Sequence, residues 1–101
     1  MATGSIWLTT GSVAVAESIA STRPDAIVFD AQHGLWDRES LFAAIASVRD
    51  KTVPLVRTAD NTPISISTAL DNGALGVIVP MIETAEQAAG VVASAKYPPV
   101  G

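Results

Sequence analysis

The sequence of 101 residues contains no cysteine and a single histidine, His33. Without cysteine, neither a disulfide framework nor a thiolate metal site can form, and a reducing cytoplasm is compatible with that composition. Only six Lys and Arg residues stand against ten Asp and Glu, and no basic cluster is present. The charge therefore predicts no nucleic-acid partner and no anionic membrane partner, and a small molecule is the expected ligand.

Long hydrophobic runs are also lacking. No apolar stretch approaches the roughly 20 residues that span a bilayer. The start, Met1 to Ser5, has no basic stretch followed by an apolar one, as a secretory signal would. These absences, with 49% hydrophobic and 16% charged residues, predict a compact soluble protein of the cytoplasm.

Short apolar runs and helical spacing alternate along the chain. The runs are continuous, as expected for parallel strands that are buried on both faces; they are Ile6 to Leu8, Ala26 to Phe29, Val53 to Val56 and Gly76 to Val79. Each is followed by a segment with the spacing of a helix; these are Val13 to Ala20, Leu41 to Val48, Ile64 to Leu70 and Ala85 to Ala95. The predicted order is strand then helix, four times.

Helix-capping residues agree with this order. Ser12, Asp37 and Thr62 stand where N-caps are expected, and Thr84 with Gln87 has the spacing of a capping box. An eight-unit TIM barrel needs about 250 residues. The fold predicted for residues 1–101 is therefore an α/β half-barrel, the first four βα units of a TIM (β/α)8 barrel. An open four-stranded sheet of flavodoxin-like topology is the alternative.

In parallel α/β folds the functional residues gather where strands end. Candidates at these positions are few: Thr9 and Thr10, residues 30–33, Arg57, and residues 80–83. His33 can act as a general acid or base near neutral pH, and a surface loop histidine without a role is an equal alternative. Asp30 can orient His33 or cap a turn.

Arg57 ends an apolar strand, where a permanent cation is costly to bury unless it faces a pocket or pairs with an anion. This position favours a functional role, and an ion pair with Asp30 or Asp60 is the structural alternative. Gln32 and Glu83 are compatible with substrate contact, although both are ordinary loop residue types.

The aromatic residues divide into two groups. Trp7, Phe29 and Phe42 fall within predicted strands or helices and are expected to pack in the core. Trp36 lies in the His33 loop, where it can anchor the loop or contact another subunit.

At these positions the sequence resembles the HpcH/HpaI aldolase (citrate lyase-like) family. The resemblance covers nearly the whole chain, and the order and spacing of all its blocks agree; they are Ile6-Trp7-Leu8, residues 29–34 (FDAQHG), Pro54-Leu55-Val56-Arg57, residues 70–74 (LDNGA), residues 76–81 (GVIVPM) and residues 97–101 (YPPVG).

The resemblance implies an enzyme that cleaves or forms the carbon–carbon bond of a 4-hydroxy-2-oxo acid, giving pyruvate and an aldehyde. It implies that His33 is the catalytic histidine, that Arg57 holds the pyruvate-derived oxygen, and that Asp30 is the acidic residue before the histidine loop. A divalent metal (Mg, Mn or Co) and a homo-oligomer are also implied. The alternatives are a non-catalytic module that binds a small anion at His33 and Arg57, and a citryl-type lyase.

Two departures from the family pattern bear on the metal. Gln32 stands where much of the family has Glu, which retains hydrogen bonding but removes a negative charge. The family's metal-binding Glu and Asp come from later strands, so no metal ligand is expected within this chain, and we expect it to be incomplete as an enzyme. Neither Lys51 nor Lys96 is placed for Schiff-base chemistry.

Overall fold

The computed structural model describes residues 4–80 and 84–94, with the backbone alone described for 91–94. Four strands alternate with four helices, in the order β1 (Ser5–Leu8), α1 (Val13–Ala20), β2 (Ala26–Asp30), α2 (Arg38–Val48), β3 (Val53–Arg57), α3 (Pro63–Asp71), β4 (Gly76–Ile78) and α4 (Ala85–Ser94). The predicted strand–helix order is confirmed.

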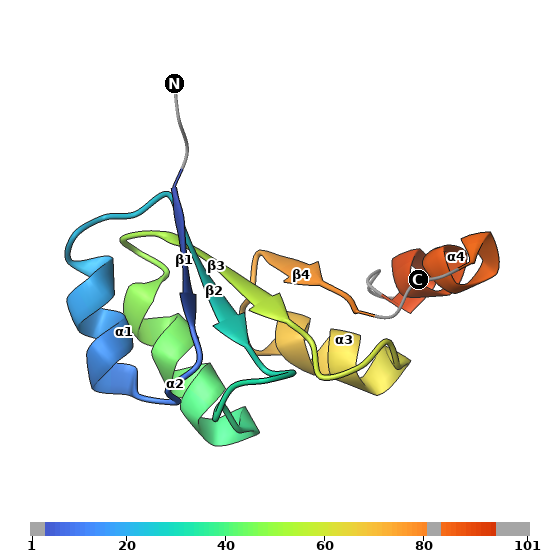
Figure 1. Ribbon diagram of the computed structural model, residues 1–101, viewed down its shortest axis with the longest axis horizontal. Coiled ribbons are helices and arrows are strands. Elements are labelled where there is room, and N and C mark those ends of the chain that lie inside the picture. The colour runs from blue at the N-terminus through green and yellow to red at the C-terminus, as the bar shows by residue number, and fades with distance from the viewer. Residues whose placement is uncertain (1–3, 81–83, 95–101) are drawn as a thin grey trace.

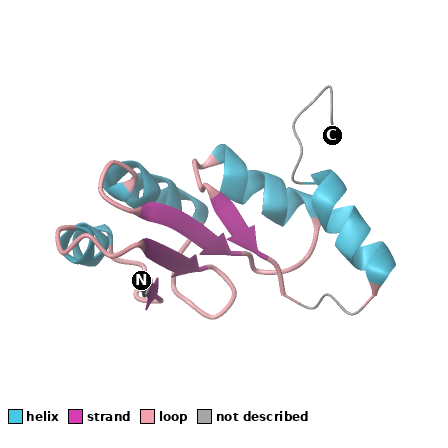
Figure 2. Ribbon diagram, turned by 90° about the horizontal axis from the view of Figure 1, so that it is seen from above, coloured by secondary structure: helices cyan, strands magenta, loops and turns pink. Residues whose placement is uncertain are grey.

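The strands form one parallel sheet in the order β1-β2-β3-β4, so each strand pairs with its neighbour in sequence (Figure 1). Parallel strands are joined by right-handed crossovers. When the strand order never reverses, such crossovers place every helix on the same side of the sheet. Figure 2 shows the helices on one side and the strands on the other.

This topology confirms the predicted half-barrel and contradicts the flavodoxin-like alternative. A flavodoxin-like sheet reverses its strand order at a switch point and carries helices on both faces. Successive βα units around a barrel keep one order and leave the other sheet face toward the barrel interior. The chain has the second arrangement.

The core lies between the helix-covered face of the sheet and α1 and α2. Ile27, Phe29 and Val56 point to this face and are fully or almost fully buried, as are Ile45 and Val48 of α2. Small side chains let α1 and α2 pack closely, and three of these are completely buried, namely Ala16, Ala20 and Ala44.

The helices begin where the sequence predicts. The side chains of Ser12, Asp37 and Thr62 accept hydrogen bonds from backbone N–H groups in the first turns of α1, α2 and α3. Thr84 and Gln87 exchange the two hydrogen bonds of a capping box. These caps satisfy N–H groups that have no partner inside the helix.

The prediction for the aromatic residues is correct for Phe29 and wrong for two others. Trp7 is 47% exposed and Phe42 is 56% exposed. Trp7 points to the sheet face that no described helix covers, and Phe42 lies on α2 away from the buried side of that helix. The expectation that the strands are buried on both faces is correct for β2, whose Val28 and Asp30 on the helix-free face are 2% and 3% exposed, and wrong for β1, where Trp7 is half exposed. Among the described helices, none has the length and apolar character needed to cross a membrane.

Candidate active site

Asp30 and Arg57 form the centre of the candidate site. Each is the last residue of its strand, and the two are partners in the parallel register of β2 and β3. Register partners point to the same face of a sheet, here the helix-free face. Arg57 donates from Nε to Asp30 Oδ1 at 3.1 Å and from Nη2 to Asp30 Oδ2 at 2.5 Å. The pair is bidentate, which fixes the plane of the guanidinium group.

The Asp30 carboxylate also holds the loop that follows β2. Its Oδ1 accepts hydrogen bonds from the backbone N–H groups of Gln32 and His33, both at 3.0 Å. Burial by itself raises the pKa of Asp30, but hydrogen bonds from Arg57, His33 and Gln32 and the charge of Arg57 outweigh it and lower the pKa below 3.8. Asp30 is therefore an anion at neutral pH, although only 3% of its surface is exposed.

Trp7 fixes the other side of Arg57. The Arg57 Cζ atom lies 5.1 Å from the centre of the Trp7 ring, within the range of a cation–π contact. Asp30 thus holds two donors on the edge of the guanidinium group, while Trp7 covers its face. A guanidinium group has five N–H donors, and the Asp30 pair uses two of them, so Arg57 has further N–H groups with which to bind an oxygen of a ligand.

The His33 loop is pinned by contacts with the end of β1. Leu35 N–H donates to the Thr9 carbonyl at 2.7 Å, and the Trp36 indole N–H donates to the Leu8 carbonyl at 2.9 Å. The Trp36 ring also packs edge-on against Phe29, with centroids 5.1 Å apart. Of the two roles left open for Trp36, the structure assigns that of a loop anchor.

Gly34 allows this loop to pass close to the backbone. A Cβ atom at residue 34 would lie 2.2 Å from the Asp30 carbonyl oxygen and 3.1 Å from the Thr9 Cα atom. No side chain fits at that distance from a backbone oxygen. Gly34 therefore brings the residue before it, His33, to the edge of the sheet where Asp30 and Arg57 lie.

The structure thus brings the four residues predicted from the sequence to one edge of the sheet. Asp30 joins the Arg57 side chain to the backbone of Gln32 and His33. His33 is exposed and Gln32 is half-buried. The ion pair with Asp30 is the structural alternative that the sequence offered for Arg57. It leaves other guanidinium N–H groups of Arg57 for a ligand. The catalytic and binding roles of Arg57 and His33 therefore stay predictions. Glu83 lies outside the described residues.

Sequence reasoning missed Trp7 as part of this site. The available signal was the period of two along a strand, because Trp7 pairs in register with Val28, which faces the same way as Asp30 two residues later. Continuous apolar strands hide that period, since both faces carry hydrophobic residues. The sequence alone therefore grouped Trp7 with the core.

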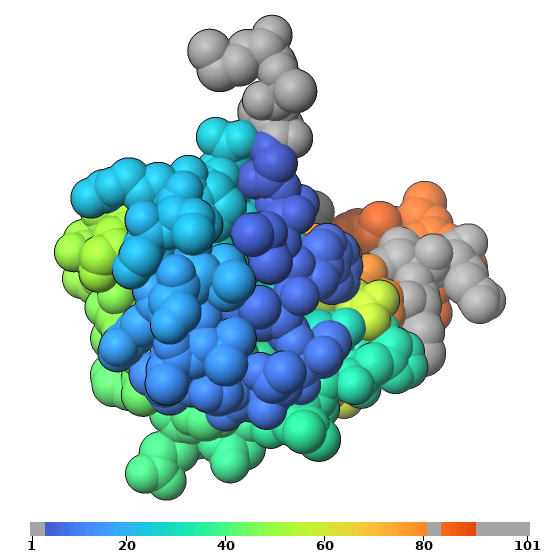
Figure 3. All heavy atoms as spheres, turned by 60° about the vertical axis from the view of Figure 1, so that its left-hand side comes forward, coloured from blue at the N-terminus to red at the C-terminus, as the bar shows by residue number. Residues whose placement is uncertain are grey.

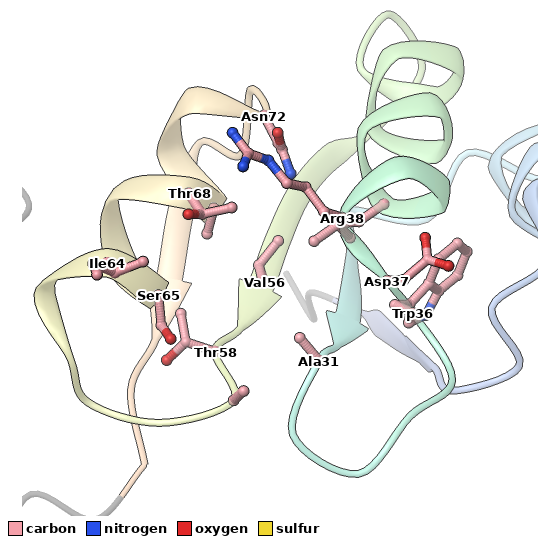
Figure 4. Close-up of a pocket in the computed structure, with 13 residues that line it drawn as sticks. Ala31, Trp36, Asp37, Arg38, Val56, Thr58, Ile64, Ser65, Thr68 and Asn72 are labelled. Carbon is pink, nitrogen blue, oxygen red and sulfur yellow. The ribbon is translucent and has the colours of Figure 1, made fainter.

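A separate cleft of about 220 Å³ lies between α2 and α3, and Val56 lines it (Figure 4). Because Val56 and Arg57 are adjacent in a strand, they point to opposite faces of the sheet. The cleft therefore lies on the helix side and is not part of the Asp30–Arg57 site. Arg38 and Asn72 lie toward one end of it, and Thr58 and Ser65 lie toward the other.

Residues 4–80 and 84–94 contain no group of three or more His, Cys, Asp or Glu side chains that could hold a metal ion. The donors at the strand ends are Asp30 and His33, and Asp30 is already engaged by Arg57 and two backbone N–H groups. The described residues alone do not make a metal site, so no chemical step is assigned to a metal here.

Comparisons with known proteins agree with this fold. The chain is 34% identical over 96 residues to 2-dehydro-3,6-dideoxy-6-sulfogluconate aldolase of Pseudomonas putida, covering 94% of this chain and 38% of that protein. It is 35% identical over 98 residues to 4-hydroxy-2-oxovalerate aldolase of Novosphingobium aromaticivorans, covering 94% and 37%. The crystal structure of macrophomate synthase matches with a TM-score of 0.87 and 32% identity, over 96% of this chain and 34% of that chain.

The chain therefore spans little more than a third of the length of these relatives. A family model described as HpcH/HpaI aldolase/citrate lyase matches residues 4–101. The strand order, the helix-free face and the placement of Asp30, His33 and Arg57 at the strand ends fit the amino-terminal portion of such a barrel. This chain belongs to the HpcH/HpaI aldolase/citrate lyase family.

Proposed function

We propose that this chain supplies the amino-terminal part of the active site of a carbon–carbon lyase that cleaves or forms 4-hydroxy-2-oxo acids. The products of cleavage are pyruvate and an aldehyde, and the reaction passes through an enolate. The observation that carries the proposal is the fixed position of Arg57, between the Asp30 carboxylate and the Trp7 ring at the carboxyl end of β3. The names of the two curated relatives, both aldolases, support the reaction class.

In this proposal Arg57 stabilises the enolate. When the bond between C3 and C4 breaks, its electron pair moves toward the C2 carbonyl, and negative charge develops on that oxygen. A cation already held in place stabilises such charge without reorganising during the reaction. Asp30 and Trp7 restrain the guanidinium group on two sides. Lysine at this position would keep the charge but could not form the bidentate contact.

His33 is proposed as the acid/base group. The 4-hydroxyl must lose its proton as it becomes the aldehyde carbonyl, and the enolate C3 must gain a proton to become the methyl group of pyruvate. Histidine exchanges protons near neutral pH. The Asp30 carboxylate positions His33 through its backbone N–H, and Gln32 on the same loop is proposed to hydrogen-bond the substrate.

A divalent metal (Mg, Mn or Co) stays part of the proposal through the family resemblance. In aldolases that use one, the metal acts as a Lewis acid on the substrate carbonyl. Since the described residues do not make a site for it, its ligands are expected outside them.

The test is a chimera in which residues 4–101 replace the matched region of the Novosphingobium aldolase, which supplies the remainder of the barrel. Pyruvate release from 4-hydroxy-2-oxo acids is measured with and without added Mg²⁺ or Mn²⁺. We expect activity in the chimera, a fall of about 10-fold or more for Arg57→Lys, and a fall of about 10²-fold or more for His33→Ala.

Arg38→Lys is the matched control, because Arg38 is an exposed arginine in the first turn of α2. It should retain the activity of the parent chimera. If a folded chimera releases no pyruvate, or if Arg57→Lys and Arg38→Lys are equally active, the proposal is wrong.

A further inference from the structure

We propose that Thr9 is a further substrate-binding residue, and that it favours substrates with a hydroxyl group at C5, the 4,5-dihydroxy-2-oxo acids. Cleavage of such a substrate gives pyruvate and a 2-hydroxyaldehyde. The inference rests on the proposed lyase function and extends it to the aldehyde part of the substrate. It is carried by the order of three groups at neighbouring strand ends, with Thr9 after β1, Asp30 and the His33 loop at the end of β2, and Arg57 at the end of β3.

Thr9 lies on the same side of the sheet as Trp7 and Arg57. It directly follows β1, two residues after Trp7, and residues two apart along a strand point to one face. Trp7 marks that face, because its ring centre lies 5.1 Å from the Arg57 Cζ atom. The register of β1 and β2, continued by one residue, places Thr9 beside Asp30. Thr9, Asp30 and Arg57 therefore form one row at the carboxyl end of the sheet.

The His33 loop packs against the backbone of Thr9. The Thr9 carbonyl accepts a hydrogen bond from the Leu35 N–H at 2.7 Å, and a Cβ atom at Gly34 would lie 3.1 Å from the Thr9 Cα atom. In Figure 3 the dark blue segment that contains β1 and the blue-green segment that follows β2 lie side by side at the surface. These contacts fix Thr9 relative to the loop that carries His33.

The hydroxyl group of Thr9 is available to a ligand. Thr9 is exposed, and within residues 4–80 and 84–94 its hydroxyl forms no hydrogen bond. The hydroxyls of Ser12 and Thr62, in contrast, accept hydrogen bonds from the first turns of helices. A threonine hydroxyl both donates and accepts and carries no charge. It therefore suits a hydroxyl group of a substrate better than a charged group.

The order of these groups across the sheet matches the order of the atoms in the substrate. With the C2 oxygen at Arg57 and the 4-hydroxyl at His33, the carbon chain of the substrate runs from β3 towards β1, and C5 is the next atom after C4. Neighbouring strands are about 4.8 Å apart, so about 10 Å separates the backbones of Arg57 and Thr9. Their side chains extend into this span from its two ends, which leaves room for a chain of a few carbon atoms between them.

The test uses the chimera with the Novosphingobium aldolase and two substrates that differ by one hydroxyl group, 4-hydroxy-2-oxopentanoate and 4,5-dihydroxy-2-oxopentanoate. Thr9→Val keeps the branched shape of the side chain and removes its hydroxyl. It should lower kcat/KM about 10-fold for the dihydroxy substrate and leave kcat/KM for the other unchanged. Thr9→Ser keeps the hydroxyl and should keep the parent's ratio of the two values. Thr10→Val is the matched control, because Thr10 is also exposed but points away from the row by the period of two.

Exchange of the pyruvate methyl protons for deuterium separates this inference from the proposed function. Pyruvate lacks C4 and C5, so Thr9→Val should exchange these protons at the parent rate. A parent chimera that neither exchanges them nor cleaves either substrate would overturn the proposed function, and this inference with it. In an active chimera, equal effects of Thr9→Val on both substrates, no effect on either, or the same effect from Thr10→Val would overturn the role of Thr9 alone. If Thr9→Val does not fold, Thr9→Ala provides the same comparison.

Discussion

The two faces of the four-stranded sheet differ in the burial and the charge of their side chains. On the helix-covered face, Ile27, Phe29 and Val56 are buried against helices of the same chain. On the opposite face, Trp7 is half exposed, and the buried Asp30 carboxylate is compensated by Arg57. The comparison shows that one face supplies the packing energy of the fold, while the other positions charged groups at the ends of the strands.

The largest difference between the faces is expected from deleting an aromatic ring on each. Phe29→Ala removes a fully buried ring and should lower the free energy of unfolding by about 4 kcal/mol. Trp7→Ala removes a larger ring that is half exposed, together with its contact with Arg57, and should lower it by about 2 kcal/mol. Urea titrations of the dilute chain followed by circular dichroism measure both values. Equal losses would contradict the division between the faces.

Asp30→Asn should produce the next largest loss of stability. It leaves the Arg57 cation without its anion, and removing one partner of a buried ion pair costs about 3 kcal/mol in free energy of unfolding. Asp50→Asn is the control, because Asp50 is well exposed and its contact with Lys51 spans 3.8 Å. A loss no greater than that of the control would show that the Asp30 pair contributes little.

The effect of Asp30→Asn on the free energy of unfolding is expected to depend on pH. The pKa of Asp30 is lowered in the folded chain, so its ionised form stabilises the fold above the unfolded pKa of about 3.9. This contribution is lost as the pH falls through the lowered pKa. The difference in unfolding free energy between the parent and Asp30→Asn should therefore shrink on acidification below about pH 4. Asp37 and Asp60, whose pKa values are also lowered by hydrogen bonds, affect both chains equally and cancel.

Gly34→Ala tests how the helix-free face positions the His33 loop. The new Cβ atom would collide with the Asp30 carbonyl oxygen, so the loop must move, at a cost of about 2 kcal/mol in unfolding free energy. Gly90→Ala is the matched control, because a Cβ atom there meets nothing within 4 Å, and alanine favours the α4 helix by about 1 kcal/mol. Thermal unfolding of the two variants should shift in opposite directions, and a shift in the same direction would contradict the account.

Trp36→Phe should have the smallest effect on stability. Phenylalanine can keep the edge contact with Phe29 but loses the indole hydrogen bond to the Leu8 carbonyl. One such bond contributes about 1 kcal/mol to the free energy of unfolding. Hydrogen exchange at Leu35 should become faster, because its N–H bonds Thr9 beside the released anchor. Unchanged exchange would show that Trp36 does not hold the loop.

Much of the fold could be predicted from the sequence, because its signals are local. Ser12, Asp37 and Thr62 each cap a helix through the residue three positions later, and such contacts are visible in the sequence. The positions at which strands end depend on contacts between residues that are far apart in the sequence. β2 and β3 continue one residue past their apolar runs, to Asp30 and Arg57, which are register partners and form an ion pair across 27 positions.

The candidate site was only partly predictable for the same reason. Position at a strand end identified Asp30, His33 and Arg57. No local pattern indicated that Trp7 covers the Arg57 guanidinium group, since that contact requires the register of three strands. The exposure of Trp7 likewise depends on which face of the sheet the helices cover.

The most direct test of the central claim measures enolate formation alone. In the chimera with the Novosphingobium aldolase, exchange of the pyruvate methyl protons for deuterium is followed by NMR, without any aldehyde. If Arg57, fixed by Asp30 and Trp7, stabilises the enolate, Arg57→Lys should slow this exchange by about 10-fold or more while Arg38→Lys leaves it unchanged. Exchange at the parent rate in Arg57→Lys would contradict the claim that this arginine stabilises the developing charge.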